Sequence, residues 1–249
     1  MSESTWTIDT FIAPVCNEDI EVLYQDDSIL LINKPSGLLS LSGKNPLNKD
    51  SVHFRLVQDF PSANLVHRLD FGTSGIMLVA LNKAVNGELT KQFQERQVSK
   101  TYTALLHGHM KEDSGTIDFP IAKDKPNFPL MKICLETGKP AVSEYVVLER
   151  LSNPDLLNPD ISRVRFTPIT GRTHQLRIHS QKIGHPIVGC DLYGLSDDDA
   201  AAPLMDRLML HATTLAFTHP VSGQRMEMEC APSFKALKIN LAGSNYESG

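Results

Sequence analysis

The chain has 249 residues, of which 41% are hydrophobic and 21% charged, with 15 glycines and 15 prolines. This balance excludes a disordered tail, a collagen-like fibre and a coiled coil, because each needs a stronger compositional bias. No apolar stretch approaches the roughly 18 residues of a membrane span, and the acidic N-terminus lacks the basic start of a signal peptide. The four cysteines form no C-x-x-C motif, which is typical of free thiols in a reducing compartment. We therefore expect a cytoplasmic protein that is not bound to a membrane.

The net charge of −5 argues against a nucleic-acid partner, because phosphate-binding proteins usually carry a basic excess. The charge is nevertheless uneven along the chain. Residues 163–182 hold five Lys or Arg side chains, two histidines and no acid, whereas residues 197–199 are all aspartates. An RNA senses charge within a Debye length of about 8 Å, so an acidic protein can still present a basic face to it. A solvated surface with uneven charge is the alternative interpretation.

In the first half of the chain, alternating or continuous apolar runs predict strands, and apolar residues at helical spacing predict two helices. A proline ends the first helix and an asparagine caps the second. The expected elements are a hairpin at 20–24 and 28–33, a loop at 34–37, a helix carrying Val52, Leu56 and Phe60 that stops at Pro61, a strand at 65–69, a turn at 71–75, a strand at 76–81, a helix from Asn82 through Phe93, and a strand at 100–106.

The second half has the same character, with no internal repeat and no low-complexity linker. Its expected elements are strands at 144–148, 164–168 and 213–218, a strand at 225–229 that pairs with the preceding one, and weaker helices at 173–183 and 204–210. Strands outnumber helices and mostly follow one another as hairpins. This order predicts an α+β fold with mixed, mostly antiparallel sheets, and argues against a doubly wound parallel sheet.

The densest group of reactive residues is the segment 67–75, H-R-L-D-F-G-T-S-G. Asp70 lies between an expected strand and a turn rich in Gly, Ser and Thr, so its carboxylate should project from a well-fixed backbone with space for a ligand. An aspartate that only caps its own turn is the alternative. The letters D-F-G also occur in protein kinases, but the glycine-rich loop, its lysine and a separate catalytic loop are absent from this sequence. A kinase is therefore excluded.

A second such segment is 170–179, T-G-R-T-H-Q-L-R-I-H. Thr173 is a plausible cap for a helix on which His174 and Arg177 share one face. His174 and the next histidine are five residues apart and form no H-E-x-x-H motif, so we expect no metal site here. An arginine that returned to Asp70 would keep the carboxylate ionised and oriented, although sequence spacing cannot show that the two meet.

Together these two segments resemble the RluA-type pseudouridine synthases. The resemblance follows the family's order over about residues 21–234, nearly the whole chain. Within the family, the chain resembles members that modify both tRNA and ribosomal RNA and lack an added N-terminal S4 RNA-binding domain, which residues 1–19 are too few to form. Further matching segments are N-K-P-S-G at 33–37, K-T-Y at 100–102, T-G-K-P-A at 137–141, G-H-P-I at 184–187 and L-H-A at 210–212.

The resemblance implies a pseudouridine-synthase-like catalytic domain at 20–235, in which mixed, mostly antiparallel sheets and flanking helices surround a central cleft. Residues 1–19 would be an N-terminal extension and residues 236–249 a C-terminal tail. The implied activity is isomerisation of uridine to pseudouridine in structured RNA, with no cofactor and no metal. The expected substrates are a tRNA anticodon stem-loop and a large-subunit ribosomal RNA hairpin, and the expected state is a monomer. A synthase for only one of these RNA classes is the alternative.

By the same resemblance, the family's catalytic aspartate falls on Asp70, its active-site tyrosine on Tyr102, and the arginine that pairs with the aspartate on Arg177. Without the resemblance, Tyr102 would be interpreted as an ordinary strand tyrosine in a core. Arg68 matches the residue that fills the space left by the flipped uridine, a role that makes physical sense because the chemistry cannot proceed inside a base stack. The other residues expected to contact RNA or assist flipping are His67, Arg172, His174 and Lys182.

Two other classes of protein are alternatives to this prediction. A non-catalytic RNA-binding domain of the same fold would be expected to have lost Asp70, Tyr102 or Arg177, and all three are present. A small-molecule hydrolase with Asp70 as nucleophile should show a dedicated base, a second carboxylate or a G-x-S-x-G motif, and the sequence shows none. Whether the carboxylate attacks the substrate or removes a proton from the sugar stays open at this level.

Overall fold

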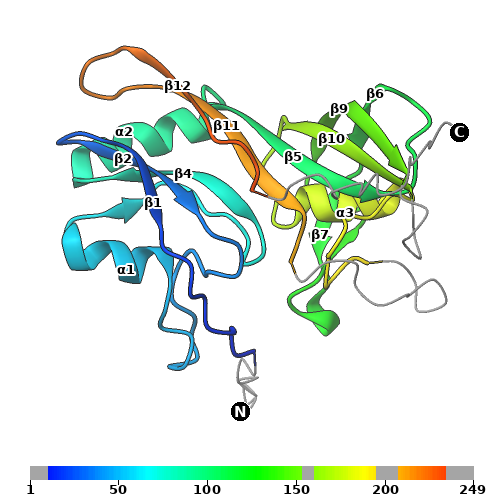
Figure 1. Ribbon diagram of the computed structural model, residues 1–249, viewed down its shortest axis with the longest axis horizontal. Coiled ribbons are helices and arrows are strands. Elements are labelled where there is room, and N and C mark those ends of the chain that lie inside the picture. The colour runs from blue at the N-terminus through cyan, green and yellow to red at the C-terminus, as the bar shows by residue number, and fades with distance from the viewer. Residues whose placement is uncertain (1–10, 153–159, 195–206, 234–249) are drawn as a thin grey trace, which may run out of the picture.

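The structure, a computed structural model, describes residues 11–152, 160–194 and 207–233 (Figure 1). The elements of this part of the chain are β1 (Glu21–Gln25), β2 (Ile29–Lys34), α1 (Val52–Asp59), β3 (Asn64–Leu65), β4 (Ser74–Ala80), α2 (Lys83–Gln94), β5 (Ser99–His107), β6 (Ser114–Asp118), β7 (Ile121–Lys123), the 3-10 helix η1 (Lys125–Asn127), β8 (Met131–Ile133), β9 (Val142–Ser152), β10 (Asp160–Pro168), α3 (Gln175–Lys182), β11 (Leu210–Thr218) and β12 (Arg225–Glu229).

One large sheet organises the molecule. Its strands follow the order β1-β2-β4-β11-β5-β10-β9-β6, with β12 added beside β11 and β3 beside β4, while β7 and β8 form a separate hairpin. The pairing of β4 with β11 is parallel, and the other pairings among the described strands are antiparallel. The prediction of an α+β fold with a mixed, mostly antiparallel sheet is confirmed. In Figure 1, β11 and β5 cross the middle of the molecule and join its two halves.

In the N-terminal half, helices cover both faces of β2 and β4. Alternate side chains of these two strands pack towards α1 on one face and towards α2 on the other. Burial on both faces explains why residues 76–81 form a continuous apolar run and not an alternating one. The expected Asn82 cap of α2 is confirmed, since its side chain accepts a hydrogen bond from the N–H of Val85 (2.9 Å). The first turn of α1 is capped by Ser51, which the sequence prediction did not include and which accepts from the N–H of Phe54 (3.1 Å).

In the C-terminal half, β10, β9 and β6 extend the sheet beyond β5, and α3 packs against this part (Figure 1). Leu176 of α3 joins the main core of this half, and Ile178 joins a smaller cluster under the β7–β8 hairpin. The expected helix at 173–183 is thus confirmed as α3. The elements β6, β7 and β8 had no counterpart among the sequence predictions.

Two expected elements differ from the structure. Of the strand expected at 65–69, only Leu65 pairs, as the second residue of β3. The backbone groups of Leu69 are bound instead by a serine side chain and not by a neighbouring strand. Of the helix expected at 204–210, residues 204–206 lie outside the described ranges and the remainder is not helical. Met209 there bonds through its C=O to Leu105 (3.1 Å) and through its N–H to Val188 (2.9 Å), and β11 begins at the next residue.

The described part of the predicted N-terminal extension, residues 11–19, is attached to the domain by side-chain hydrogen bonds. Asn48 Nδ2 donates to the carbonyl of Phe11 (2.7 Å), and Arg55 donates to the carbonyls of Cys16 and Glu18 (2.6 Å each). The predicted tail at 236–249 lies outside the described residues. Over the described ranges, no helix is long and apolar enough to cross a membrane.

Candidate active site

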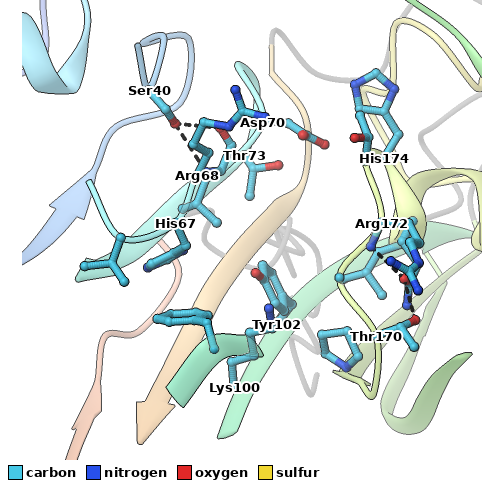
Figure 2. A pocket seen from close by; sticks show the side chains of 18 of the residues that line it. Ser40, His67, Arg68, Asp70, Thr73, Lys100, Tyr102, Thr170, Arg172 and His174 are labelled. Atoms are coloured by element: carbon cyan, nitrogen blue, oxygen red, sulfur yellow. Dashed lines mark hydrogen bonds between the residues drawn. The ribbon is translucent and has the colours of Figure 1, made fainter. Parts of the chain in front are cut away.

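A cleft of about 900 Å³ lies between the two halves of the molecule. Its lining comes mainly from the loop 66–73 that precedes β4, from the start of β5, and from the loop 168–174 that leads into α3. Figure 2 shows Asp70 on one wall, His174 on the facing wall and Tyr102 on the strand between them. The fold thus brings together the two segments that the sequence singled out.

The loop that carries Asp70 is held by its own backbone and by a distant serine. The N–H of Thr73 donates to the carbonyl of Asp70 (3.1 Å), which closes a tight turn. The hydroxyl of Ser40 accepts from the N–H of Leu69 (3.2 Å) and donates to its carbonyl (2.7 Å), as the dashed lines in Figure 2 mark. Asp70 therefore projects into the cleft from a backbone that is fixed on both sides.

The segment 33–37, for which the sequence indicated no role, lies under this loop. Lys34 is fully buried, and its ammonium donates to the carbonyl of Phe71 (3.2 Å) and to two carbonyls of its own loop (2.8 and 2.7 Å). The hydroxyl of Ser36 donates to the carbonyl of Gly72 (2.7 Å). Burial lowers the pKa of Lys34 to about 7, although the negative charge of Asp70 acts in the opposite direction. The segment supports the Asp70 loop from below.

Tyr102 packs against the cores of both halves and also lines the cleft. Burial raises the pKa of its phenol, and the Asp70 carboxylate raises it further. The phenol therefore stays protonated at neutral pH and can donate a hydrogen bond towards a ligand. The interpretation of Tyr102 as a packed strand tyrosine is correct for the ring, and its catalytic role stays a prediction.

Arg177 is directed to a different carboxylate from the one expected. Its guanidinium is nearly buried, bonds to Asp191 and to Cys190 Sγ (3.4 Å), and lies 5.5 Å from the ring centroid of Tyr193. Burial acts to lower the pKa of Arg177, but Cys190, Asp191 and Asp70 outweigh this effect and raise it. The expected ion pair with Asp70 is wrong, since within the described ranges the carboxylate partner of Arg177 is Asp191. The two residues line one cleft without a hydrogen bond or ion pair between them, because the guanidinium of Arg177 is bound by residues 190–193.

His174, and not Thr173, is the residue that immediately precedes the first turn of α3, and its φ of 54° is left-handed. No side chain caps this end of the helix, so the expected Thr173 cap is wrong. The Nδ1 atom of His174 lies 2.9 Å from the hydroxyl of Tyr193. Burial lowers the pKa of His174, against a smaller opposing effect of Asp70, and this shift favours the neutral form of the ring. We therefore expect His174 to contact RNA by hydrogen bonds and not by charge.

The loop before α3 is organised by Gln175, a buried residue that the sequence analysis did not identify. Its Oε1 accepts from the N–H of Arg172 (3.0 Å) and the hydroxyl of Thr170 (2.8 Å), while its Nε2 donates to the carbonyl of Val142 (2.9 Å). Arg172 also donates from Nε to the carbonyl of Pro140 (3.0 Å). Within the described residues its terminal nitrogens form no hydrogen bond, so they remain available to a ligand.

His67 belongs to the support of the cleft more than to its binding surface. Its Nε2 accepts from the N–H of Leu78 (3.0 Å), and its ring stacks on Phe93 with centroids 4.8 Å apart. Burial, together with the positive charge of Lys100, lowers the pKa of His67 to about 3. The expected contact with RNA is therefore not available to Nε2, which already serves the sheet.

The basic run 163–182 does not form one face. Arg163 pairs with Glu149 (3.3 Å), and Lys182 lies at the far end of α3, outside the cleft lining. The positive charge of the cleft comes instead from residues that are far apart in the sequence. Among the described residues that line the cleft, Asp70 is the single carboxylate. The Lys and Arg residues of the lining are Arg68, Arg96, Lys100, Arg172 and Arg177.

Arg96 and Lys100 are the cleft cations that the sequence analysis did not assign. Arg96 follows the end of α2 with a φ of 59°. It and His174 are the two described non-glycine residues with positive φ, and both line the cleft. Such unfavourable backbone conformations concentrate at functional sites. A lone arginine after a helix carries no sequence signal, whereas Lys100 lies in the K-T-Y segment.

Comparison with known proteins assigns the chain to a family. Residues 28–182 match the family model described as RNA pseudouridylate synthase. The chain belongs to this family, which confirms the resemblance seen in its motifs.

Relatives resemble the chain over nearly their whole length. The dual-specificity RNA pseudouridine synthase RluA of Yersinia pestis is 49% identical over 213 residues, which cover 86% of this chain and 99% of the relative. The protein of the same name from Escherichia coli (strain K12) is 46% identical over 86% of this chain and 93% of its own. The solved structure of human RNA Pseudouridylate Synthase Domain Containing 1 is 33% identical, with a TM-score of 0.73 over 89% of this chain and 87% of that one.

Proposed function

We propose that this chain converts uridine to pseudouridine within RNA, with Asp70 as the catalytic carboxylate. The observation that carries the proposal is the position of Asp70 as the single carboxylate in the described lining of a basic cleft, on a clamped loop facing Tyr102. A protein of net charge −5 that gathers five Lys and Arg side chains in one cleft is suited to a polyanionic ligand.

The reaction breaks the N-glycosidic bond of uridine, turns the uracil and joins its C5 to the ribose. C5 then loses its proton, and N1, which the broken bond has released, takes one up. No atom is gained or lost overall, so the chemistry asks for a base or nucleophile and a group that handles a proton. Asp70 can serve in the first role, by attack or by proton abstraction at the sugar. Tyr102, protonated and adjacent, can hold the turning base or take part in moving its proton.

A uridine within a stem-loop must leave its stack before Asp70 can reach it. Arg68 lies on the cleft wall beside Asp70 and is exposed (Figure 2). Within the described residues its guanidinium forms no hydrogen bond or ion pair, so it is available to enter the space that the uridine vacates. Its loss would leave the unstacking cost of a few kcal/mol uncompensated.

For substrates we propose a tRNA anticodon stem-loop and a large-subunit ribosomal RNA hairpin. The relatives named dual-specificity RNA pseudouridine synthases, similar to the chain along almost their entire length, support two RNA classes over one. We also propose that residues 20–235 form the catalytic domain and that the protein acts in the cytoplasm as a monomer. The cleft built by one chain supports the monomer, and the four unpaired cysteine thiols support a reducing compartment.

The test maps pseudouridine chemically in total RNA from cells with and without this protein. We expect sites that disappear in a tRNA anticodon loop and in large-subunit ribosomal RNA, and that return when the purified wild-type protein is added to the RNA. Loss in one class alone would restrict the proposal to a single substrate class. Unchanged maps, together with RNA binding by the purified protein, would replace the proposal by a non-catalytic RNA-binding domain.

A further inference from the structure

Lys100 is a cation in the cleft with no role in the function proposed above. It lies near the start of β5, two positions before Tyr102, so both side chains leave the same face of the strand, about 7 Å apart at their backbones. Figure 2 shows Lys100 below Tyr102, on the side away from Asp70. The cleft therefore presents a carboxylate, a phenol and an ammonium in that order.

The ammonium of Lys100 reaches across the floor of the cleft from one wall to the other. It lies 5.8 Å from the ring centroid of Phe93 on α2, and a Cβ added to Gly171 on the facing loop would be 3.6 Å from Nζ. Gly171 has no side chain, so no side chain from this position covers the ammonium. Arg172, next to this glycine, brings a second cation to the same side.

The surroundings of Lys100 contain no anion. Its neighbour His67 is neutral at pH 7, and within the described residues Nζ forms no hydrogen bond or ion pair. Burial lowers the pKa of Lys100, and no carboxylate offsets this effect. A largely buried ammonium without a charged partner is costly, and the cost is recovered when a ligand brings an anion to it.

We propose that Lys100 binds the phosphate group adjacent to the flipped uridine and so fixes the nucleotide in register with Asp70. The proposal rests on the function proposed above, since it needs an RNA in the cleft. A phosphate is the only group of an RNA that carries a full negative charge, and Lys recognises it as a compact point charge. A carbonyl oxygen of the uracil is the competing partner and would make Lys100 a base-binding residue.

The experiment combines Lys100→Met with RNA in which one phosphate at a time is replaced by an uncharged methylphosphonate. The probe is a synthetic anticodon stem-loop whose target uridine has been mapped, and affinity is measured in an Asp70→Asn background to prevent turnover. We expect Lys100→Met to weaken binding about 10- to 100-fold, the effect of one hydrogen bond between charged groups. We also expect it to reduce the slope of log K against log salt by about 0.7 to 0.9.

The decisive result is coupling between the lysine and one phosphate. A methylphosphonate next to the target uridine should weaken binding to the protein with Lys100 and have no further effect on Lys100→Met. Lys100→Arg keeps the charge and should restore most of the affinity. Lys83→Met, which removes an exposed lysine at the opposite end of α2, is the matched control and should bind as tightly as its parent.

The outcomes separate the two proposals. The phosphate assignment is overturned if the protein with Asp70 intact forms pseudouridine on this RNA but neither flanking methylphosphonate weakens its binding. This measurement uses the wild-type protein, so it does not depend on whether a variant folds. If 4-thiouridine at the target changes binding to the protein with Lys100 but not to Lys100→Met, and no methylphosphonate does so, Lys100 binds the base. This result also overturns the phosphate assignment. A wild-type protein without activity on any RNA overturns the proposed function, and this assignment with it.

Discussion

A single hydroxyl of Ser40 binds both backbone polar groups of Leu69, the residue that precedes Asp70, at 3.2 Å from its N–H and 2.7 Å to its carbonyl. The two residues are 29 positions apart, and Ser40 is 6% exposed. A contact from outside the Asp70 motif therefore determines where the carboxylate points.

Ser40→Ala should lower kcat while leaving the protein folded. The variant leaves the N–H and C=O of Leu69 without a partner in a buried place, which costs about 1–3 kcal/mol of stability for each unpaired group. The loosened loop should lower kcat by a larger factor than it changes KM, because the substrate is still bound but the carboxylate is less well placed. Urea unfolding and single-turnover rates measure the two effects. Ser42→Ala is the matched control, because Ser42 also lines the cleft but bonds to Lys49 (2.7 Å) and not to the Asp70 loop. Equal rates in both variants would contradict the positioning role of Ser40.

Asp70→Asn should abolish turnover and leave structure and RNA affinity intact. The substitution keeps size and shape but removes the negative charge, and no other described cleft residue has a carboxylate to replace it. We expect a loss of more than about 1,000-fold in pseudouridine formation on a tRNA transcript. Thermal unfolding and filter binding provide the controls. Turnover within a few fold of wild type would remove Asp70 from the catalytic role.

Arg68→Ala should distinguish a gap-filling arginine from a phosphate contact. On a structured stem-loop we expect turnover to fall about tenfold or more, because the cost of unstacking is no longer offset. On a substrate whose target uridine is already unstacked, by an abasic neighbour or a widened loop, turnover by Arg68→Ala should fall by a smaller factor. A purely structural role predicts a lower melting temperature, with both activities falling together. Equal losses on both substrates at unchanged stability would rule out gap filling.

Arg172→Ala and Lys182→Ala should differ in their effects on RNA binding, whereas a continuous basic face would make the two effects alike. Arg172 lines the cleft, whereas Lys182 lies outside it with its ammonium 5.4 Å from the ring centroid of Phe119. Arg172→Ala should weaken binding to all RNAs and reduce the salt slope by about 0.7 to 0.9, the value for one phosphate contact. Lys182→Ala should have a smaller effect on both quantities. Affinities of both variants for two unrelated stem-loops, measured over a range of salt concentrations, test this prediction. A larger effect of Lys182→Ala than of Arg172→Ala would indicate that residues 163–182 form the RNA-binding face.

Acid should destabilise the protein partly through His67. Burial lowers the pKa of His67 to about 3 in the folded state, whereas an unfolded histidine has a pKa of about 6.5. Between these values the unfolded chain binds more protons, so stability is lost as pH falls through this window. His67→Gln, whose amide oxygen can still accept from the N–H of Leu78, removes the titration. Between pH 4 and 6 its free energy of unfolding should fall less steeply than that of wild type, by about 1.4 kcal/mol per pH unit. Urea unfolding across this range provides the measurement, and parallel curves would contradict it.

Local signals in the sequence determined much of this protein. Apolar spacing and caps predicted α1, α2 and the central strands, because helix starts and strand faces depend on residues a few positions apart. The motif around Asp70 and its resemblance to a family determined the chemistry. Where local pattern was a poor guide, as at 65–69, a side chain from elsewhere had replaced the strand partner that the pattern implied.

Only the tertiary structure decided which charged groups meet. In the structure, Arg177 pairs with Asp191, and His67 accepts a hydrogen bond from β4. The basic residues of 163–182 lie in separate places, with Arg163 paired to Glu149. The fold also gathers Arg96 and Lys100 into the cleft from the far end of α2 and the start of β5. The physical reason is that electrostatic and hydrogen-bond energies depend on distance through space and on burial, and neither quantity is defined until strands far apart in the chain have paired.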